Sequence, residues 1–353
     1  MNFFVKFIKE LIDDGHSVDI ATNESEFPVA ECYKEWGCRL YRIDTVRSPV
    51  NFNNLKAIQQ IREIVQKKRK YDIVHCHTPV AAVCVRLACR KIRNHGTRIY
   101  YTAHGFHFYR GAPLRNWLLY YPIEWICAYW TDVLITINPE DYILAKKRMH
   151  AERIEYIPGV GIDLDKIEKV KVDADRVRGK LGIPKSAKIL LSVGELNKNK
   201  NHKTVIKAIA DLDLYYVIAG SGNFKISLQN LIQKLNIADK VKLIGPRKDI
   251  IELCKTADFF VFPSFREGLP VAVMEAMACG LPVVCSKTRG NRDLIDEKGG
   301  VFFNPHSVRD CYLAISKLLD SDFSGMGTYN KEKVSQYSIE KINRKMKEIM
   351  RLY

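Results

Sequence analysis

The sequence lacks the cysteine spacings that mark a secreted or zinc-stapled domain. Its ten cysteines form no CxxC pair. They are scattered through segments with strand-like or helix-like patterns, which favours reduced, buried thiols. We expect no secretory leader and a cytoplasmic protein.

A membrane-spanning run is also missing. The most apolar stretch, residues 117–130, is shorter than the ~20 residues that a helical span needs, and it contains Pro122 and Glu124. Its tryptophans and tyrosines suit a lipid interface, and a buried core helix explains them equally well. The sequence thus excludes a transmembrane anchor in this stretch and leaves a peripheral membrane contact open.

Metal ligands are sparse. The segments expected to line a site carry no carboxylate cluster of the DxD type. The triplet His75, Cys76 and His77 closes an apolar strand, where consecutive side chains point to opposite faces. We therefore expect no metal and no other cofactor.

Negative charge is scarce relative to positive charge, and the formal net charge is +16. Such a surface needs an acidic partner: nucleic acid, anionic lipid or a nucleotide diphosphate. No aromatic platform or known nucleic-acid module accompanies the basic clusters, so nucleic acid is not expected. Basic clusters lie at residues 67–70, 86–98 and 146–148. Each cluster alone can be explained as a solvated helix face. Together they suit a protein surface that rests on the anionic inner face of a membrane.

What the sequence does contain is a long alternation of strand and helix patterns over 353 residues, which is enough for two α/β domains with parallel sheets. The first series has strands at 17–22, 73–77, 98–102 and 133–136. It opens on a helix over residues 3–12, whereas a Rossmann-like half opens on a strand and a glycine-bearing turn. We interpret this as the absence of the first strand of that lobe.

The alternation breaks at residues 156–163, a segment with Pro158, Gly159 and Gly161 that is typical of a hinge. A second series follows, with strands at 189–193, 215–219, 241–244, 259–262 and 283–285. A last amphipathic helix starts near Ser338, which suits an N-cap. The predicted domains are residues 1–162, residues 163–337 and a terminal helix, 338–353, that packs back on the first domain.

The densest chemical signal is the segment 266–284. Gly268 frees the backbone and Pro270 suits the first turn of a helix, so Glu267 precedes that helix and Glu275 lies inside it. Free amides at the start of a helix form an anion site that suits a pyrophosphate. Taken alone, the two glutamates could equally be an N-terminal charge and a solvated side chain.

These residues resemble the Glu-x7-Glu motif of the retaining GT-B glycosyltransferases of family 4, the family of bacterial capsule and exopolysaccharide enzymes. The resemblance implies two Rossmann-like lobes that face a central cleft. It implies that Glu267 contacts the donor sugar and Glu275 the nucleotide ribose, with Gly268, Leu269 and Pro270 between them lining the donor site.

Other family landmarks appear in order along nearly the whole chain. Thr102–Gly105 looks like the first-lobe loop whose histidine, His104, points at the donor sugar. Gly194 with Lys200 is similar to the loop that grips the diphosphate. The turn with Arg247 resembles the one near the base, and the loop with Gly290 resembles a donor-side loop.

One residue departs from the pattern. The family places arginine after the glycine of the diphosphate loop, and this sequence has Glu195, which would repel a diphosphate unless its side chain points away. Lys198 and Lys200 could compensate. The missing first strand is the second departure.

The resemblance implies a metal-independent hexosyltransferase with a nucleotide diphosphate sugar as donor, UDP favoured, and a lipid-linked or growing saccharide as acceptor. The site must hold the negative charge that grows on the leaving phosphate while the sugar becomes oxocarbenium-like. Catalytic roles fall to Lys200, Glu267 and His104. The alternatives are a non-catalytic sugar-nucleotide-binding partner and a sugar-nucleotide epimerase of the same fold.

Overall fold

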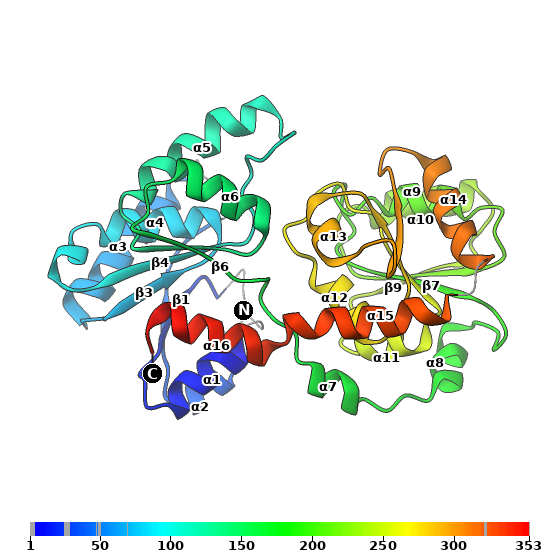
Figure 1. The fold of residues 1–353 in the computed structure, drawn as a ribbon, viewed down its shortest axis with the longest axis horizontal. Helices are drawn as coiled ribbons and strands as arrows, with labels where there is room; N and C mark the ends of the chain where they lie inside the picture. Colours follow the sequence, from blue (N-terminus) through cyan, green and yellow to red (C-terminus); the bar gives the residue numbers. More distant parts are fainter. Residues whose placement is uncertain are drawn as a thin grey trace. The chain divides into compact units, whose positions relative to one another are not determined.

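The computed structural model describes residues 4–24, 29–46, 48, 51–68, 70–320 and 323–352. It divides into an N-terminal unit, Met1–Gly161 with Ile342–Tyr353, and a C-terminal unit, Ile162–Lys341. The sequence predicts boundaries at 162/163 and 337/338, and the structure sets the second one inside the last helix. Both units are built on parallel sheets, as the α/β prediction requires (Figure 1).

The N-terminal unit contains two parallel sheets. β1 (Asp19–Thr22) pairs with β2 (Arg39–Arg42). The second sheet has the order β3-β4-β5-β6, with strands Ile73–Cys76, Arg98–Ala103, Val133–Thr136 and Arg153–Tyr156. Among the described residues, β1 and β3 each keep one edge without a strand partner, and a cavity of about 420 Å³ is lined by both strands.

Among the described residues before 161, six α-helices cover these strands: α1 (Val5–Asp13), α2 (Cys32–Glu35), α3 (Asn53–Glu63), α4 (Pro79–Cys89), α5 (Leu114–Ala128) and α6 (Pro139–Arg148). A π-helical turn, Ile64–Lys68, extends α3, and a 3₁₀ turn, Ile92–His95, follows α4. The first described element is a helix, as the sequence pattern predicts.

The C-terminal unit is one doubly wound sheet of order β12-β11-β10-β7-β8-β9. Its strands are β7 (Ile189–Val193), β8 (Tyr215–Ala219), β9 (Val241–Gly245), β10 (Phe259–Phe262), β11 (Val283–Ser286) and β12 (Gly300–Phe303). The strand order reverses between β7 and β10. In such sheets ligands bind at this reversal, beyond the carboxyl ends of the strands.

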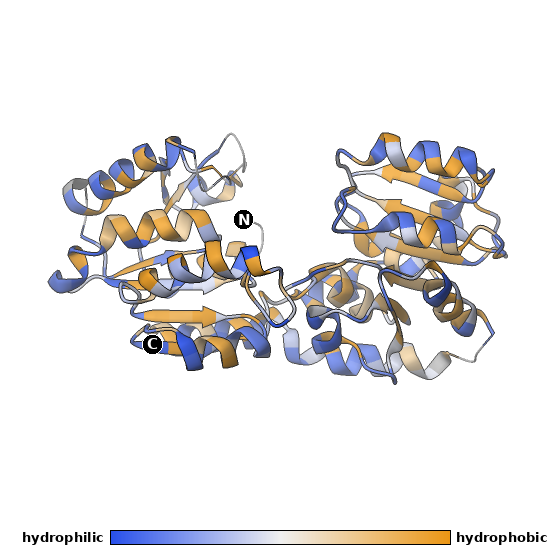
Figure 2. Cartoon of the chain, turned by 90° about the horizontal axis from the view of Figure 1, so that it is seen from above, coloured by the Kyte–Doolittle hydropathy of each residue, from blue (hydrophilic) through white to orange (hydrophobic). Residues whose placement is uncertain are grey.

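Helices cover both faces of this sheet: α7 (Leu164–Lys169), α8 (Ala174–Leu181), α9 (His202–Ala208), α10 (Lys225–Lys234), α11 (Ile250–Thr256), α12 (Val271–Ala278), α13 (Arg289–Leu294), α14 (Val308–Leu319) and α15 (Ser324–Val334). Successive residues of β7 enter different cores, because strand side chains alternate: Leu190 packs in one cluster and Leu191 in the other. Figure 2 accordingly shows the strands as mostly hydrophobic and the helices as mixed.

The last helix, α16 (Ile339–Met350), packs on the N-terminal unit. Ser338 caps it by accepting a hydrogen bond from the Lys341 amide. Its residues Ile342, Met346 and Ile349 are buried in one cluster with Phe7 and Leu11 of α1, and the two helices lie side by side in Figure 1.

The sequence pattern did not predict β2, β6, β12, α2, α6, α7, α8, α13, α14 or α15. The helix α15 contains Gly325 and Gly327. Packing explains the second glycine: a Cβ atom on Gly327 would lie 2.2 Å from the Gly280 carbonyl oxygen, so glycine here allows two backbones to touch. In the part of the chain that the structure describes, no helix is long and apolar enough to cross a membrane.

Candidate active site

The turn after β7 positions Lys200. The Gly194 amide donates to the Ala219 carbonyl and so holds the turn on the neighbouring strand. The Asn197 side chain accepts a hydrogen bond from the Lys200 amide at 3.0 Å. A Cβ atom on Gly194 would lie 3.4 Å from Cδ of Lys200, so the glycine leaves room for the lysine stem to run along the turn.

Lys200 and Glu267 meet at the point where the strand order reverses. Nζ of Lys200 is 2.8 Å from Oε1 of Glu267, and the side chains are 21% and 12% exposed. The ammonium group also lies 4.7 Å from the centroid of the Phe262 ring, which β10 supplies. This half-buried pair brings together two of the three residues predicted to be catalytic.

Backbone hydrogen bonds join the two turns that carry this pair. The Phe265 amide donates to the Asn199 carbonyl at 2.8 Å, and the Asn199 side chain donates to the Arg266 carbonyl at 3.0 Å. Since both ends of each contact belong to turns next to Lys200 and Glu267, the geometry of the pair depends on the main chain. Sequence reasoning did not identify Asn199.

The segment Gly268–Pro270 leads directly into α12. Pro270 is the N-cap, one residue before the predicted first turn, and no side chain caps the helix. Leu269 packs against the core. Gly290, at the start of α13, touches this segment so closely that a Cβ atom there would lie 2.5 Å from the Gly268 carbonyl oxygen. The structure therefore places these predicted donor-binding residues together.

Glu275 lies within α12 and is largely buried. Burial raises the pKa of its carboxyl to about 7, because the charged form loses hydration. Within the described residues its carboxylate makes no hydrogen bond and no ion pair. The carboxylate is thus partly withdrawn from water and has no protein partner, and hydroxyl groups of a ligand could donate to it.

Arg247 lies apart from these residues. It follows β9, the edge strand, which is separated from β7 by β8. Its guanidinium forms an ion pair with Asp249, with Nε 2.8 Å from Oδ1. The hydrogen bond to Asp249 raises the pKa of Arg247. The structure does not bring Arg247 into contact with the Lys200–Glu267 pair.

Glu195, the acidic departure in the diphosphate turn, has an exposed side chain, whereas its neighbour Leu196 is buried. The Leu196 amide and carbonyl are held by Ser221 and Phe224. The turn therefore anchors itself at Leu196 and leaves Glu195 in solvent, where water screens its charge.

A polar network behind the pair was missed by sequence reasoning. Ser286 donates to the Ser264 carbonyl at 2.5 Å, and the Asn291 side chain donates to the Ser286 carbonyl at 2.9 Å. All three side chains are buried. Serines at or just past the ends of two apolar strands were the available signal, and their hydrogen bond joins the ends of β10 and β11.

His104 belongs to the N-terminal unit, directly after β4. Its Nε2 lies 3.3 Å from Nδ1 of His77, and His75 is 2.8 Å from the Thr102 hydroxyl. The His75 and His77 rings lie on one side of β3, with centroids 4.2 Å apart. Burial lowers the pKa of His104 to about 4, so its imidazole is neutral near pH 7. The described residues contain no group of His, Cys, Asp and Glu arranged to hold a metal.

Two family models cover most of the chain. The model described as Glycosyltransferase Family 4 matches residues 2–166, which include His104. The model described as Glycosyl transferases group 1 matches residues 173–345, which include Lys200, Glu267 and Glu275. EpsD of Bacillus subtilis (strain 168), an assigned glycosyltransferase, is 40% identical over 83% of this chain and 77% of its own length.

The chain belongs to the family 4 glycosyltransferases. This glycosyltransferase is also 29% identical, over 79% of its length and 76% of the relative, to the UDP-Gal:alpha-D-GlcNAc-diphosphoundecaprenol alpha-1,3-galactosyltransferase of Escherichia coli. A sucrose-phosphate synthase from Thermosynechococcus elongatus has the same fold, with a TM-score of 0.80 and 20% identity over 99% of this chain and 92% of that one. The predicted GT-B fold is confirmed.

Proposed function

We propose that this glycosyltransferase moves a hexosyl unit from a UDP-sugar to a lipid-linked or growing saccharide, with retention of configuration and without a metal. The observation that carries the proposal is the pairing of Lys200 with Glu267 at the reversal of the strand order, directly before the helix that carries Glu275. The name of the Escherichia coli relative supports both the UDP-sugar and the lipid diphosphate.

The roles follow from the chemistry of each group. The Lys200 ammonium and the amides at the start of α12 stabilise the charge that grows on the leaving diphosphate. Glu267 accepts hydrogen bonds from hydroxyls of the donor sugar, and Glu275 accepts them from the ribose. We assign no general base, and the leaving phosphate takes the acceptor proton.

The place of action follows from the acceptor. A saccharide on a lipid diphosphate is available only at a membrane surface, so the enzyme would work as a peripheral protein on the inner face, in the synthesis of a surface polysaccharide. Exposed basic and aromatic residues of the N-terminal unit support this part of the proposal.

The first test is calorimetric titration of the full chain with UDP, GDP and ADP in the presence of a chelator. UDP should bind most tightly, and Glu275→Ala should weaken its affinity about tenfold or more, because the ribose loses a buried acceptor. Glu332→Ala, which removes an exposed carboxylate from α15, is the matched control and should change nothing.

Transfer itself needs a separate measurement. Incubation with UDP-sugars and a lipid diphosphate saccharide should give a product whose anomeric proton coupling equals that of the donor. An inverted product would contradict the retaining mechanism. Nucleotide binding without any transfer would favour a non-catalytic sugar-nucleotide-binding partner, and conversion of the donor sugar without acceptor would favour an epimerase.

A further inference from the structure

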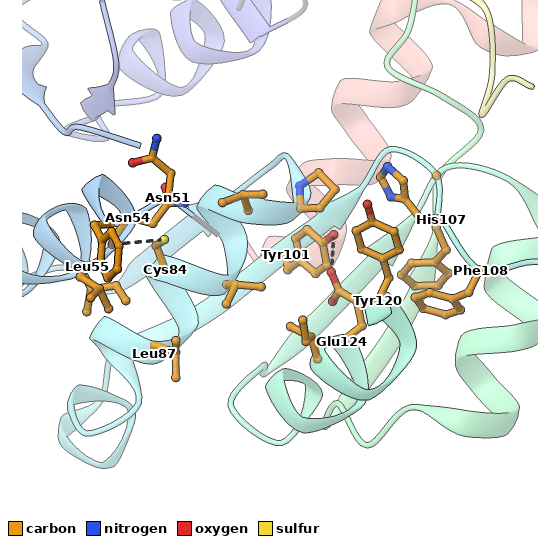
Figure 3. Close-up of a pocket in the computed structure, with 18 residues that line it drawn as sticks. Asn51, Asn54, Leu55, Cys84, Leu87, Tyr101, His107, Phe108, Tyr120 and Glu124 are labelled. Atoms are coloured by element: carbon orange, nitrogen blue, oxygen red, sulfur yellow. Dashed lines mark hydrogen bonds between the residues drawn. The ribbon is translucent and has the colours of Figure 1, made fainter. Parts of the chain in front are cut away.

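The N-terminal unit contains an apolar cavity, open to solvent on one side, that the donor chemistry does not use. Its volume is about 350 Å³, within the range of small-molecule sites. Figure 3 shows side chains of α3, α4, α5 and the loop after β4 converging on it. The apolar lining residues include Ile58, Val80, Val83, Leu87, Phe106 and Phe108.

The most buried polar groups in the wall already have partners. The Asn54 side chain donates to the Ser48 carbonyl and accepts from the Val46 amide. Glu124 pairs with the buried Arg86 at 2.8 Å and accepts from the Tyr101 hydroxyl at 3.2 Å, the contact drawn in Figure 3. Since these groups need no ligand, the cavity favours an apolar one.

The mouth of the cavity is apolar and open to solvent. Phe52 is 84% exposed, Leu55 64% and Ile123 41%, although all three line the cavity. On α5 the apolar surface continues through Leu118 and Leu119, which do not line the cavity. A continuous apolar surface that leads into a cavity marks a binding site.

The segment that supplies much of this mouth is rich in positive charge. Residues 51–100 contain 11 lysines and arginines against only two acidic residues, Glu63 and Asp72. The exposed Lys56 follows Leu55 and pairs with Asp44 at 2.7 Å, and the exposed Arg115 lies on α5, the helix that supplies Ile123. The matching ligand has an apolar chain that enters the cavity and an anionic head that stays among the basic side chains.

We propose that this cavity binds the first part of the isoprenoid chain of the lipid-linked acceptor, with its diphosphate at the basic rim. The inference rests on the proposed function and deepens it, because it gives the acceptor a binding site in the N-terminal unit. A concave cavity of about 350 Å³ favours one inserted chain over a bilayer surface, which would contact only the exposed residues.

The test uses the full chain and geranylgeranyl phosphate at concentrations below its micelle threshold, followed by calorimetry. Val83→Trp fills the cavity from α4 and should weaken binding about tenfold or more. Leu118→Gln removes an exposed apolar side chain that does not line the cavity, and it should leave the affinity for geranylgeranyl phosphate unchanged. Inorganic phosphate should not bind measurably, since it lacks the chain.

Three results would overturn the proposal: no binding of geranylgeranyl phosphate, binding that Val83→Trp leaves intact, or equal losses in both variants. Equal losses, accompanied by binding to phosphatidylglycerol vesicles, would assign the surface to the bilayer. UDP titration of each variant controls for misfolding. The UDP titration also separates the two proposals. Loss of UDP binding with intact binding of geranylgeranyl phosphate would contradict only the proposed donor site, and loss of geranylgeranyl phosphate binding with intact UDP binding would contradict only the proposed lipid site.

Discussion

The two units build their candidate sites in different ways. In the C-terminal unit the site follows strand ends that are tied by main-chain contacts, such as the Phe265 amide on the Asn199 carbonyl and the close approach of Gly290 to Gly268. In the N-terminal unit the cavity is enclosed by side chains of three helices. The first kind tolerates little change in the backbone, and the second depends on the size and polarity of side chains.

The largest effect should come from Lys200. Lys200→Ala removes the charge next to the leaving diphosphate and leaves Glu267 half-buried without its partner, so kcat/KM should fall about 10²–10³-fold. Lys198→Ala removes an exposed lysine from the same turn and should change kcat/KM little. Steady-state kinetics of both variants tests this prediction. Equal losses of kcat/KM in the two variants would show that the turn acts only through its net charge.

A backbone substitution sharpens the comparison next. Gly290→Ala forces a Cβ atom against the Gly268 carbonyl, so we expect unfolding to require about 1–3 kcal/mol less. Gly179→Ala, in the exposed helix α8 with nothing within 4 Å, should stabilise by up to about 1 kcal/mol. Urea unfolding measures both, and a neutral Gly290→Ala would mean that α13 can shift away from the donor segment.

The pH dependence of nucleotide binding should be a smaller effect than those of Lys200→Ala and Gly290→Ala. The pKa of Glu275 is about 7 without ligand, and the ionised carboxylate is the better acceptor for ribose hydroxyls. UDP affinity should therefore fall about tenfold between about pH 8 and about pH 6 as the carboxyl protonates. Calorimetry at several pH values should show this slope, and Glu275→Gln should remove it; a slope that persists would assign the titration to another group.

The smallest expected effect concerns acid stability of the N-terminal unit. Burial lowers the pKa of His75 to about 3 and of His104 to about 4, so the folded state binds fewer protons than the unfolded state. Their stabilising contribution is present above about pH 6.5 and is lost as the pH falls toward about 4. His75→Gln should flatten this dependence in urea unfolding, unlike His95→Gln at an exposed position.

The sequence predicts the donor site better than the rest of the molecule. Glu267, Gly268, Pro270 and Glu275 are close in sequence, so the breaks in periodicity around α12 were enough to place them together. Their partner Lys200 was placed by the family resemblance. Arg247 shows the limit of such reasoning, because its pairing with Asp249 depends on side-chain geometry that no spacing reveals.

The cavity of the N-terminal unit was not predicted, because its walls come from segments more than 70 residues apart, from Asn51 to Glu124. The run 117–130 was noted as suited either to a core or to a lipid interface, and α5 combines both: Cys127 and Ala128 are buried, while Leu118 and Leu119 are exposed. Short elements such as β2 and α2 also escaped prediction, since each spans only four residues.

The packing of α16 on α1 has a consequence for the order of folding. The apolar side chains of Phe7 and Leu11 are made more than 300 residues before their partners Ile342 and Met346. The described strands of the C-terminal unit, by contrast, all lie before residue 304. The N-terminal unit therefore completes its core only after the strands of the C-terminal unit have been made, and a stop before α16 leaves that core open even when the donor site is whole.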